Sequence, residues 1–497
     1  MTVSKSKYCN YVSCPKKCWL SVHKPELVEI DADKQRRFDE GNEVGALARG
    51  LFGEFIDVTT RAEDGSLDIA AMIKKTQEAI ASGAENICEA AFSKDGLYCA
   101  VDILHKQNGG YAIYEVKSTN SAKAYHYTDA AFQKYLLELC GINVTGTYLI
   151  HLNRDYVRNG EIEAELGKLF KCKIINNKVA KEIVKVKDMS DKAKLLLDGP
   201  EPKTVFGAHC TSPYDCDFFE YCKLDAPKPS VLDLYDFDDR WQLYNGGICT
   251  FEDILASGYA LGDIQRRQIE FALGIQSGTY VDRSAIKAFL SKLTYPLYFL
   301  DFESMMSALP PYDGTHTYQQ IPFQYSLHIA EKIGGKIEHR EFLGKPETDP
   351  RRALAEQLVK DIPENACTVA YYADFERTRI TELAEAYPDL KERLLNIRDH
   401  IVDMLEPFKN GYYYNRNMGG SFSIKSVLPA IFPDDSELNY HNLEGVHNGT
   451  EAMNTFPAMR DMSPAERERT RQQMLAYCKL DTYAMVKLWQ ELVKASK

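Results

Sequence analysis

The feature that most constrains the fold is a short apolar segment that carries two acids, Tyr298-Phe-Leu-Asp-Phe-Glu303. The apolar residues begin near residue 293, and together they predict a strand buried inside a domain. Asp301 and Glu303 are two residues apart, so on a strand their side chains point to the same face. Burying two carboxylates in so apolar a strand is unfavourable unless a cation offsets their charge. The segment therefore predicts a site where these acids bind one or two divalent metal ions.

Two later segments carry residues that could join this site. Residues 368–376 predict a strand that runs into a helix, with Glu376 at the start of the helix. Residues 474–485 are amphipathic, and Tyr477 and Asp481 share one helix face because they are four residues apart. A carboxylate on that face could bind metal, and a phenol could orient water. For each motif alone, the alternative is an acid that is simply satisfied within its strand or helix.

Taken together, the three motifs resemble the DnaQ-like DEDD 3′–5′ exonucleases, whose fold is RNase H-like. Asp301 and Glu303 match the first motif of that family. Asp481 and Tyr477 match the third motif in its tyrosine variant, and Glu376 stands where the second motif usually has aspartate. The resemblance implies that the four acids hold two Mg²⁺ or Mn²⁺ ions and that Tyr477 assists catalysis.

A second group of charged residues lies earlier in the chain. Residues 97–103 predict a strand that bears Asp102, and residues 111–117 predict the next strand. Glu115 and Lys117 share a strand face, and Asp102 can approach Glu115 if the two strands pair. Two carboxylates can hold Mg²⁺ or Mn²⁺, and an ammonium beside them can position water or stabilise charge on a phosphate. The alternative is a hairpin with ordinary solvated charges.

This second group resembles the core motif of the RecB-type PD-(D/E)XK nucleases, with Asp102 followed by Glu115-Val116-Lys117. Gln133, on a helix predicted to open at Asp129, matches the glutamine that the family places after this motif. Glu89, on the preceding segment, is a peripheral match. The resemblance implies that three acids bind metal and that two further residues are catalytic: Asp102, Glu115 and Glu89 in the first role, and Lys117 and Gln133 in the second.

Both resemblances include a departure from the family pattern. Many RecB-type relatives carry a histidine where this chain has Gly45, so that ligand is missing or replaced, for example by Glu43. In the other motif set, Asp374 is a fallback for the ligand position that Glu376 occupies. These departures keep a different class open, a nucleic-acid-binding protein in which one or both nuclease sites are inactive.

Cysteines bracket the early part of the chain. Of the 13 cysteines, ten lie at or before Cys222, and the last three of these ten are evenly spaced as Cys210-x(5)-Cys216-x(5)-Cys222. Cys14 lies near the start and precedes a proline. Four thiolates suit a [4Fe–4S] cluster, and zinc would accept the same ligands. The alternative is a set of unrelated cysteines on a packing loop.

This arrangement of one early and three late cysteines resembles the iron–sulfur staple of CRISPR-associated RecB-like exonucleases and AddB-type helicase–nucleases. The resemblance implies that Cys14, Cys210, Cys216 and Cys222 bind a [4Fe–4S] cluster. Such a cluster would tie the two ends of the domain together and contribute stability. A regulatory role through its redox state is a third functional possibility.

The chain is long enough for two or three domains, with 497 residues of which 44% are hydrophobic and 27% charged. Two prolines and a serine in residues 226–230 interrupt any regular element. We expect an α/β protein in three parts. These are a PD-(D/E)XK restriction-endonuclease-like domain over residues 1–225, a helical connector over residues 226–290 and a DnaQ-like, RNase H-fold domain over residues 291–497.

Residues 419–425 and 441–452 complete a pattern that resembles a domain-of-unknown-function family, whose members append a DnaQ-like module to a RecB-like nuclease. Lys425 could bind a nucleic-acid phosphate, although capping and packing are the commoner fates of residues in such a segment. Residues 168–187 hold seven lysines and one glutamate. This run could follow a phosphate backbone, but we favour a solvated surface helix.

Charge and composition limit the remaining possibilities. The net charge of −12 does not indicate nucleic-acid binding, although a basic channel can lie on an acidic protein. No apolar run approaches the ~20 residues of a membrane-spanning helix, and the first residues lack an apolar signal-peptide core. An odd number of cysteines fits reduced thiols in the cytosol.

We therefore expect a cytoplasmic, metal-dependent nuclease that acts on nucleic acid and does not bind membranes. By resemblance, DNA is favoured over RNA and exonuclease over endonuclease, with genome defence or repair as the setting. The alternative is a nucleic-acid-binding or iron–sulfur regulatory protein in which one or both nuclease sites are inactive. Protein partners are not predicted.

Overall fold

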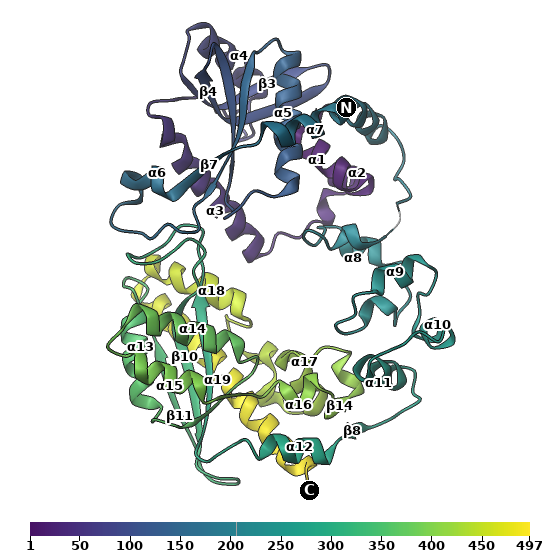
Figure 1. The fold of residues 1–497 in the computed structure, drawn as a ribbon, viewed down its shortest axis with the longest axis vertical. Coiled ribbons are helices and arrows are strands. Elements are labelled where there is room, and N and C mark those ends of the chain that lie inside the picture. Colours follow the sequence, from purple (N-terminus) through teal and green to yellow (C-terminus); the bar gives the residue numbers. More distant parts are fainter. Residues whose placement is uncertain (205) are drawn as a thin grey trace. The chain divides into compact units, whose positions relative to one another are not determined.

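The computed structural model describes residues 1–204 and 206–497, which form two compact units (Figure 1). The first unit comprises Met1–Asp225 and Ser307–Gln319, and the second comprises Ala226–Met306 and Gln320–Lys497. The chain therefore passes between the units three times. Each unit contains a large mixed sheet with helices packed on it, which confirms the expected α/β class. The second unit includes residues 226–290, for which the sequence predicts a connector.

The sheet of the first unit has seven strands in the order β2-β3-β4-β5-β6-β7, and β1 pairs with β4. Neighbouring strands from β3 to β5 are antiparallel, whereas β5 and β6 are parallel. The strands are β1 (Val3–Ser4), β2 (Ile56–Asp57), β3 (Asn86–Lys94), β4 (Leu97–Gln107), β5 (Gly110–Lys117), β6 (Val144–Leu152) and β7 (Phe170–Ile174).

Helices and one loop segment cover the two faces of this sheet. Phe132, Leu136 and Val186 from two of the helices join one core cluster on one face. Val44 from another helix and Leu309 from the segment Ser307–Gln319 join a second cluster. The helices of the unit are α1 (Lys5–Ser13), α2 (Pro15–His23), α3 (Ala32–Ala48), α4 (Ile69–Ala81), α5 (Ala124–Leu139), α6 (Leu166–Leu169), α7 (Asn176–Leu197) and α8 (Phe219–Lys223).

One edge of β4 is shared by two different strands. Leu97 and Tyr98 pair with β1, whereas pairing with β5 begins at Ile103. Residues 99–102 therefore lie where β4 passes from one partner to the other. Because α1 begins at Lys5, directly after β1, its first residue lies beside this break.

The segment Ser307–Gln319, between the second unit's main strands, belongs to the first unit. Leu309 is buried in the first unit's core. The guanidinium of Arg158 donates from Nη1 to the carbonyl oxygens of Pro310 at 3.1 Å and Pro311 at 3.0 Å. The hydroxyl of Tyr318 donates to the carbonyl of Ser118. The first unit thus includes a segment that lies far beyond its main part in the sequence.

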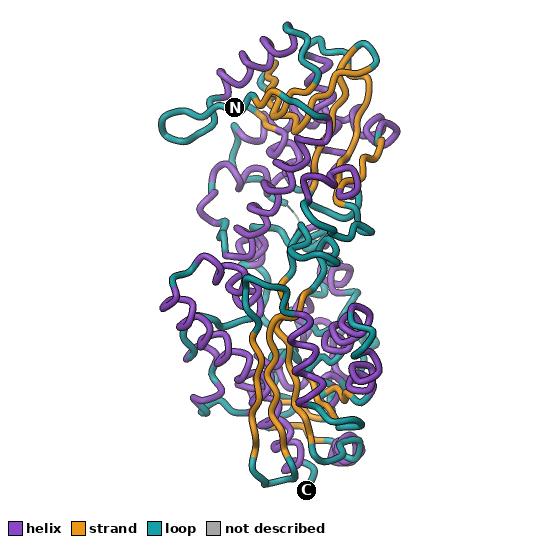
Figure 2. The backbone as a smooth tube through the Cα atoms, turned by 90° about the vertical axis from the view of Figure 1, so that its left-hand side faces the viewer, coloured by secondary structure: helices purple, strands orange, loops and turns teal. Residues whose placement is uncertain are grey.

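The second unit has a five-stranded sheet in the order β11-β10-β9-β12-β13, with β9 in the centre. Its long strands run side by side (Figure 2). β9, β10 and β11 are mutually antiparallel, whereas β12 and β13 run parallel to β9. The strands are β9 (Leu297–Met305), β10 (Ile321–Ala330), β11 (Ile337–Leu343), β12 (Cys367–Ala370) and β13 (Ile401–Asp403). A separate pair is formed by β8 (Thr279–Val281) and β14 (Tyr413–Asn415).

Alternation along β9 separates its apolar face from its acidic face. Leu300 and Phe302 join the core formed with α13 (Arg351–Asp361), α14 (Asp374–Ala386) and α15 (Lys391–Asp399). Phe299 points the other way and packs against Trp489 of α19 (Pro464–Ala495), with ring centroids 5.8 Å apart. Asp301 and Glu303 share the side of Phe299 and therefore face α19.

Shorter helices complete the second unit. The segment 231–273 packs around a small apolar core that includes Val231, Phe251 and Ile269. The helices are α9 (Arg240–Asn245), α10 (Phe251–Ala256), α11 (Asp263–Ala272), α12 (Arg283–Leu290), α16 (Glu406–Lys409), α17 (Ile424–Ile431) and α18 (Gly449–Ala458). Across the residues that the structure describes, none of the helices combines the length and apolar character needed to cross a membrane.

Candidate metal centres

Four acids from three elements of the second unit lie together. Asp301 and Glu303 come from β9, Glu376 from the first turn of α14 and Asp481 from α19. One ligand atom each from Asp301, Glu303 and Cys478 lie within 4.8 Å of one another. Glu303, Glu376 and Asp481 are almost fully buried. The structure thus brings together the four acids that the sequence predicts as metal ligands.

The electrostatics of this cluster favour a bound cation. Burial raises the pKa of Asp301 and Glu303 well above their usual values, and the other carboxylates raise it further. Burial also raises the pKa of Glu376 to about 8 and that of Asp481 to about 6. The Oε2 atom of Glu376 is buried and lacks a hydrogen-bond partner among the described residues. A cluster of carboxylate oxygens with an unused acceptor fits Mg²⁺ or Mn²⁺.

Aromatic side chains and a lysine surround the acids. The hydroxyl of Tyr440 donates to Asp481 Oδ1 at 2.6 Å. Lys425 Nζ is 3.5 Å from the hydroxyl of Tyr477 and 3.2 Å from the carbonyl oxygen of His447, to which it donates. The same ammonium lies over the rings of Tyr440 and Tyr477, at 5.2 and 5.3 Å from their centroids. The predicted residues Lys425 and Tyr477 therefore both lie beside the acids.

A cavity of about 820 Å³ lies next to this cluster. Lys425 and Tyr440 line it, and so do apolar side chains that include Phe432 and Leu438 and polar side chains that include His441. The four acids do not themselves line the cavity, but Tyr440 lies between it and Asp481, to which its hydroxyl donates. The cavity offers a mixed apolar and polar space for a substrate beside the carboxylates.

Some residues of this centre were missed by sequence reasoning. Cys478 Sγ lies 3.7 Å from Asp301 Oδ2, and Cys478 is three residues before Asp481 on the same helix. Residues three apart lie on neighbouring positions of a helix face, so this spacing could have indicated Cys478 as a member of the site. Tyr440 has no comparable local signal, since it lies on a separate segment that only the tertiary fold brings to α19. The fallback ligand Asp374 is exposed and pairs with Arg377.

The first unit brings its own predicted residues together. Lys117 Nζ donates to Glu115 Oε1 at 2.7 Å and to Asp129 Oδ2 at 2.5 Å. Gln133 of α5 donates from Nε2 to Glu115 Oε2. Asp102 Oδ2 accepts from the backbone nitrogen of Val116 at 2.7 Å, which fixes it beside the same strand.

Three further residues of this centre were missed. Lys5 of α1 donates to Glu115 Oε1 at 2.9 Å, and the thiol of Cys9 donates to Asp129 Oδ1 at 2.8 Å. Asp129 itself marks the predicted start of a helix, but no role follows from that position. Lys5 and Cys9 lie more than a hundred residues from these partners, so no local spacing could reveal them.

The first centre contains more positive charge than the second. Burial, reinforced by the charge of Glu115, raises the pKa of Asp102 to about 7. For Glu115, burial acts in the same direction, but the ammonium groups of Lys117 and Lys5 outweigh it and hold the pKa well below its usual range. The amide oxygen of Gln133 is buried without a partner among the described residues. Asp102 and Glu115 supply oxygen ligands that fit Mg²⁺ or Mn²⁺.

Glu89 and Gly45 are less closely associated with this centre than the other predicted residues. Continuing the register of β3 and β4 places Glu89 opposite Asp102, but Glu89 has a φ of 55° and its Oε1 pairs with Arg49 at 3.0 Å. The carboxylate of Glu89 is therefore paired with Arg49 and not with the other acids of the centre. On α3, a Cβ at Gly45 would meet no atom within 4 Å, and the side chain of Glu43 is exposed.

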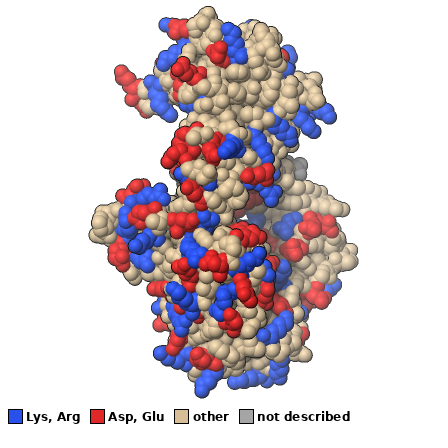
Figure 3. Space-filling model, turned by 60° about the vertical axis from the view of Figure 1, so that its left-hand side comes forward, with Lys and Arg blue, Asp and Glu red and all other residues tan. Residues whose placement is uncertain are grey.

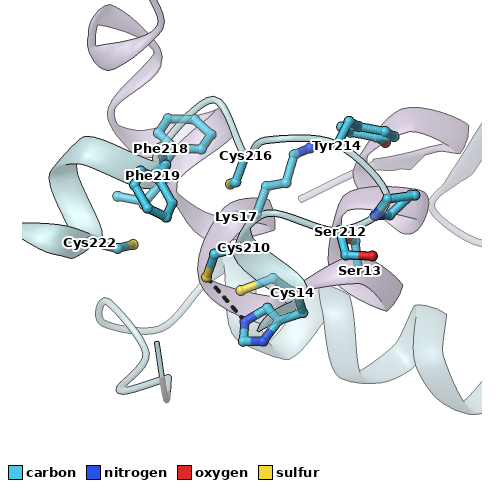
Figure 4. Close-up of a pocket in the computed structure, with 13 residues that line it drawn as sticks. Ser13, Cys14, Lys17, Cys210, Ser212, Tyr214, Cys216, Phe218, Phe219 and Cys222 are labelled. Atoms are coloured by element: carbon cyan, nitrogen blue, oxygen red, sulfur yellow. Dashed lines mark hydrogen bonds between the residues drawn. The ribbon is translucent and has the colours of Figure 1, made fainter. Parts of the chain in front are cut away.

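Cys14, Cys210, Cys216 and Cys222 line one pocket (Figure 4). The sulfurs of Cys14 and Cys210 face each other, and the other two point into the same space. Burial raises the pKa of Cys222 to about 11, and the charges of the other three contribute. His209, which sequence reasoning missed, also lines the pocket, and its Nε2 is 3.6 Å from Cys210 Sγ. Four thiols that influence one another suit an iron–sulfur cluster or zinc.

The lysine-rich segment 168–187 spans β7 and most of α7. On α7, Lys187 pairs with Asp191 at 3.1 Å and Lys185 with Glu182 at 3.5 Å. Over the face seen in Figure 3, basic and acidic side chains are interspersed in the same way. These pairs favour a solvated helix over a dedicated phosphate track.

A family model described as a domain of unknown function (DUF2779) matches residues 298–423. The match begins in β9 and ends before α17, so it includes Asp301, Glu303 and Glu376 and excludes Asp481. It identifies no nuclease family. No curated protein and no solved structure matches the chain.

Proposed function

We propose that this protein is a metal-dependent nuclease that hydrolyses phosphodiester bonds. The observation that carries this proposal is the convergence of Asp301, Glu303, Glu376 and Asp481. Four carboxylates so close together, three of them almost fully buried, are stable only with protons or cations. Bound there, Mg²⁺ or Mn²⁺ would supply Lewis-acid activation of the phosphate and of a water molecule.

The chain's own groups have distinct tasks at this centre. Tyr440 holds Asp481 through its hydroxyl, so the carboxylate keeps its direction toward the other acids. Lys425 places a positive charge between the cavity and the acids, where it can attract a phosphate. Tyr477 lies beside that ammonium and can orient the attacking water.

The centre of the first unit supports a second phosphodiesterase site of the PD-(D/E)XK type. Asp102 and Glu115 would hold Mg²⁺ or Mn²⁺, and Lys117 would act on water or the phosphate beside them. Gln133 fixes the Oε2 atom of Glu115. The preference for DNA over RNA and for exonuclease activity rests on family resemblance, as does a role in genome defence or repair in the cytoplasm.

The four-cysteine pocket would hold a [4Fe–4S] cluster, with zinc as the alternative. Its ligands come from the start of the first unit and from residues 210–222, so the cluster would join two distant parts of the chain. Such a link restricts the unfolded chain and contributes stability.

The test uses full-length protein purified without oxygen, with its metal content measured. End-labelled single- and double-stranded DNA and RNA are incubated with Mn²⁺ and wild type, Lys117→Ala, Asp301→Ala or the double variant. We expect cleavage of DNA that is lost fully only in the double variant, and the product ladder gives the polarity. Absence of cleavage by wild type on every substrate would contradict the proposal and favour a nucleic-acid-binding or iron–sulfur regulatory protein.

A further inference from the structure

The backbone of Lys5 is held in place independently of its side chain. Val3 N donates to the carbonyl oxygen of Gly96 at 2.9 Å, and β1 pairs with the start of β4. Ser4 caps α1 by accepting from Lys7 N at 3.3 Å. These contacts leave Lys5 beside the break where β4 passes from β1 to β5. The side chain of Lys5 therefore reaches Glu115 from a fixed backbone position.

Donors occupy three of the four acceptor positions of Glu115, two on Oε1 and one on Oε2. Oε1 accepts from Lys5 at 2.9 Å and from Lys117 at 2.7 Å, and Oε2 accepts from Gln133. A carboxylate oxygen has two lone pairs, so both acceptor positions of Oε1 are in use. A divalent metal that uses Oε1 must therefore displace one of the two ammonium groups.

The two lysines differ in what they retain after displacement. Lys117 also donates to Asp129 at 2.5 Å, so it can leave Glu115 and remain paired. Among the described residues, Lys5 forms its ion pair with Glu115 alone. Lys117 stays near the site whether or not metal binds, because Asp129 holds it. In the part of the chain that the structure describes, no second acid holds Lys5, so its ammonium can move away from the charge of an arriving metal ion. Lys5 is thus the ammonium group whose position competes with metal.

We propose that Lys5 is an internal counter-ion that a divalent metal displaces when it binds Glu115 through Oε1. This inference rests on the proposed metal site of the first unit. Without metal, Lys5 neutralises a carboxylate that is 1% exposed and keeps the folded site free of an uncompensated buried charge. With metal, the ammonium gives up Oε1, so the affinity for metal is set partly by the cost of that exchange.

The first experiment measures Mn²⁺ binding by calorimetry in full-length protein carrying Asp301→Ala, which disables the centre of the second unit. Lys5→Met removes the charge and keeps much of the side-chain length, and Lys5→Arg keeps a positive charge. Lys7→Met is the matched control, because Lys7 lies on the same helix and donates to the carbonyl oxygen of Thr2. We expect Lys5→Met to bind Mn²⁺ about tenfold more tightly. Lys5→Arg and Lys7→Met should bind no more tightly than the parent.

Equal or weaker Mn²⁺ affinity in Lys5→Met would overturn the inference while leaving the metal site in place. No Mn²⁺ binding in either the parent or Lys5→Met would overturn the inference together with the metal assignment. Binding in Lys5→Met alone would support it, because removal of the competing charge would have opened the site.

A second measurement uses wild-type protein, so it does not depend on a variant folding. Amine acylation followed by mass spectrometry compares the reactivity of Lys5 and Lys7 with and without Mg²⁺. Displacement predicts that Mg²⁺ increases the acylation of Lys5 several-fold and leaves that of Lys7 unchanged. Unchanged or reduced reactivity of Lys5 in saturating Mg²⁺ would contradict the proposal.

Discussion

Asp102 on β4 and Asp481 on α19 are carboxylates of the two different units, and the charges around them differ. Beside Asp102, the ammonium groups of Lys5 and Lys117 oppose the charge of Glu115. Beside Asp481, the acids outnumber the one lysine, Lys425, whose charge acts on the cluster. The acids of the second centre therefore need protons or a bound cation more than those of the first centre do, because fewer positive side chains offset their charge.

This dependence predicts how the stability of the metal-free protein changes with pH. Burial raises the pKa of Asp481 to about 6 and that of Glu376 to about 8, above unfolded values of about 4. The folded state thus binds protons that the unfolded state releases, and the stabilisation present below about pH 4 is lost as pH rises through 6 and 8. We expect the melting temperature of chelator-treated protein to fall over this window, and saturating Mg²⁺ to reduce the slope. A melting temperature that rises with pH would contradict this account.

A matched pair of substitutions tests the altered second motif. Glu376→Gln keeps the shape of a buried side chain and removes its charge, whereas Asp374→Asn changes an exposed acid on the same helix. If Glu376 is a metal ligand, Glu376→Gln should reduce cleavage by about 100-fold or more in a protein that also carries Lys117→Ala. Asp374→Asn in the same background should remain within about twofold of its parent. The reverse order would identify Asp374 as the ligand.

At the scale of elements, the sequence predicted strands better than helix limits. The strand expected at residues 111–117 is β5 (Gly110–Lys117), and its residues 111–115 are all buried, so a short apolar run marks it clearly. The helix expected at residues 474–485 is the middle of α19, which starts ten residues earlier. Its first turns are polar, so apolar periodicity could not mark them. The capping box of Ser463 and Glu466 was the available signal.

The residues of the candidate sites also differ in how well the sequence could predict them. Residues that share a short motif, such as Glu115 and Lys117, could be predicted because strand geometry fixes their common face. Lys5 and Tyr440 could not, because they come from segments that only tertiary packing brings to the acids. The cavity beside Lys425 could not be predicted either, since most of its lining comes from the irregular segment between α17 and α18.

The segment Ser307–Gln319 supports a prediction about the core of the first unit. Leu309 is 7% exposed and packs in the cluster that contains Val44 and Ile103. Leu309→Ala should destabilise the first unit by about 2–5 kcal/mol, because it leaves a cavity in that core. With Trp241→Phe and Trp489→Phe in place, the fluorescence of Trp19 reports on this unit during denaturation. An unchanged Trp19 transition would show that the segment is dispensable for the first unit.

At the scale of the whole molecule, three chain crossings make the two units hard to separate. A specific protease site inserted after Asp225 would cut the sequence between the first unit's main part and the second unit. We expect the two fragments to elute together under native conditions, because Ser307–Gln319 belongs to the first unit's fold. The same cut in Leu309→Ala protein should weaken this association. Fragments that separate freely without denaturant would contradict the prediction.

The same segment has a consequence for protein synthesis. Ser307–Gln319 leaves the ribosome about ninety residues after Asp225, which corresponds to about 5–20 s of translation. During that interval the nascent first unit lacks Leu309 and the carbonyl partners of Arg158. Its sheet emerges with one face incompletely covered, where a chaperone can bind. The fold of the first unit is therefore completed only in chains whose translation has already passed β9.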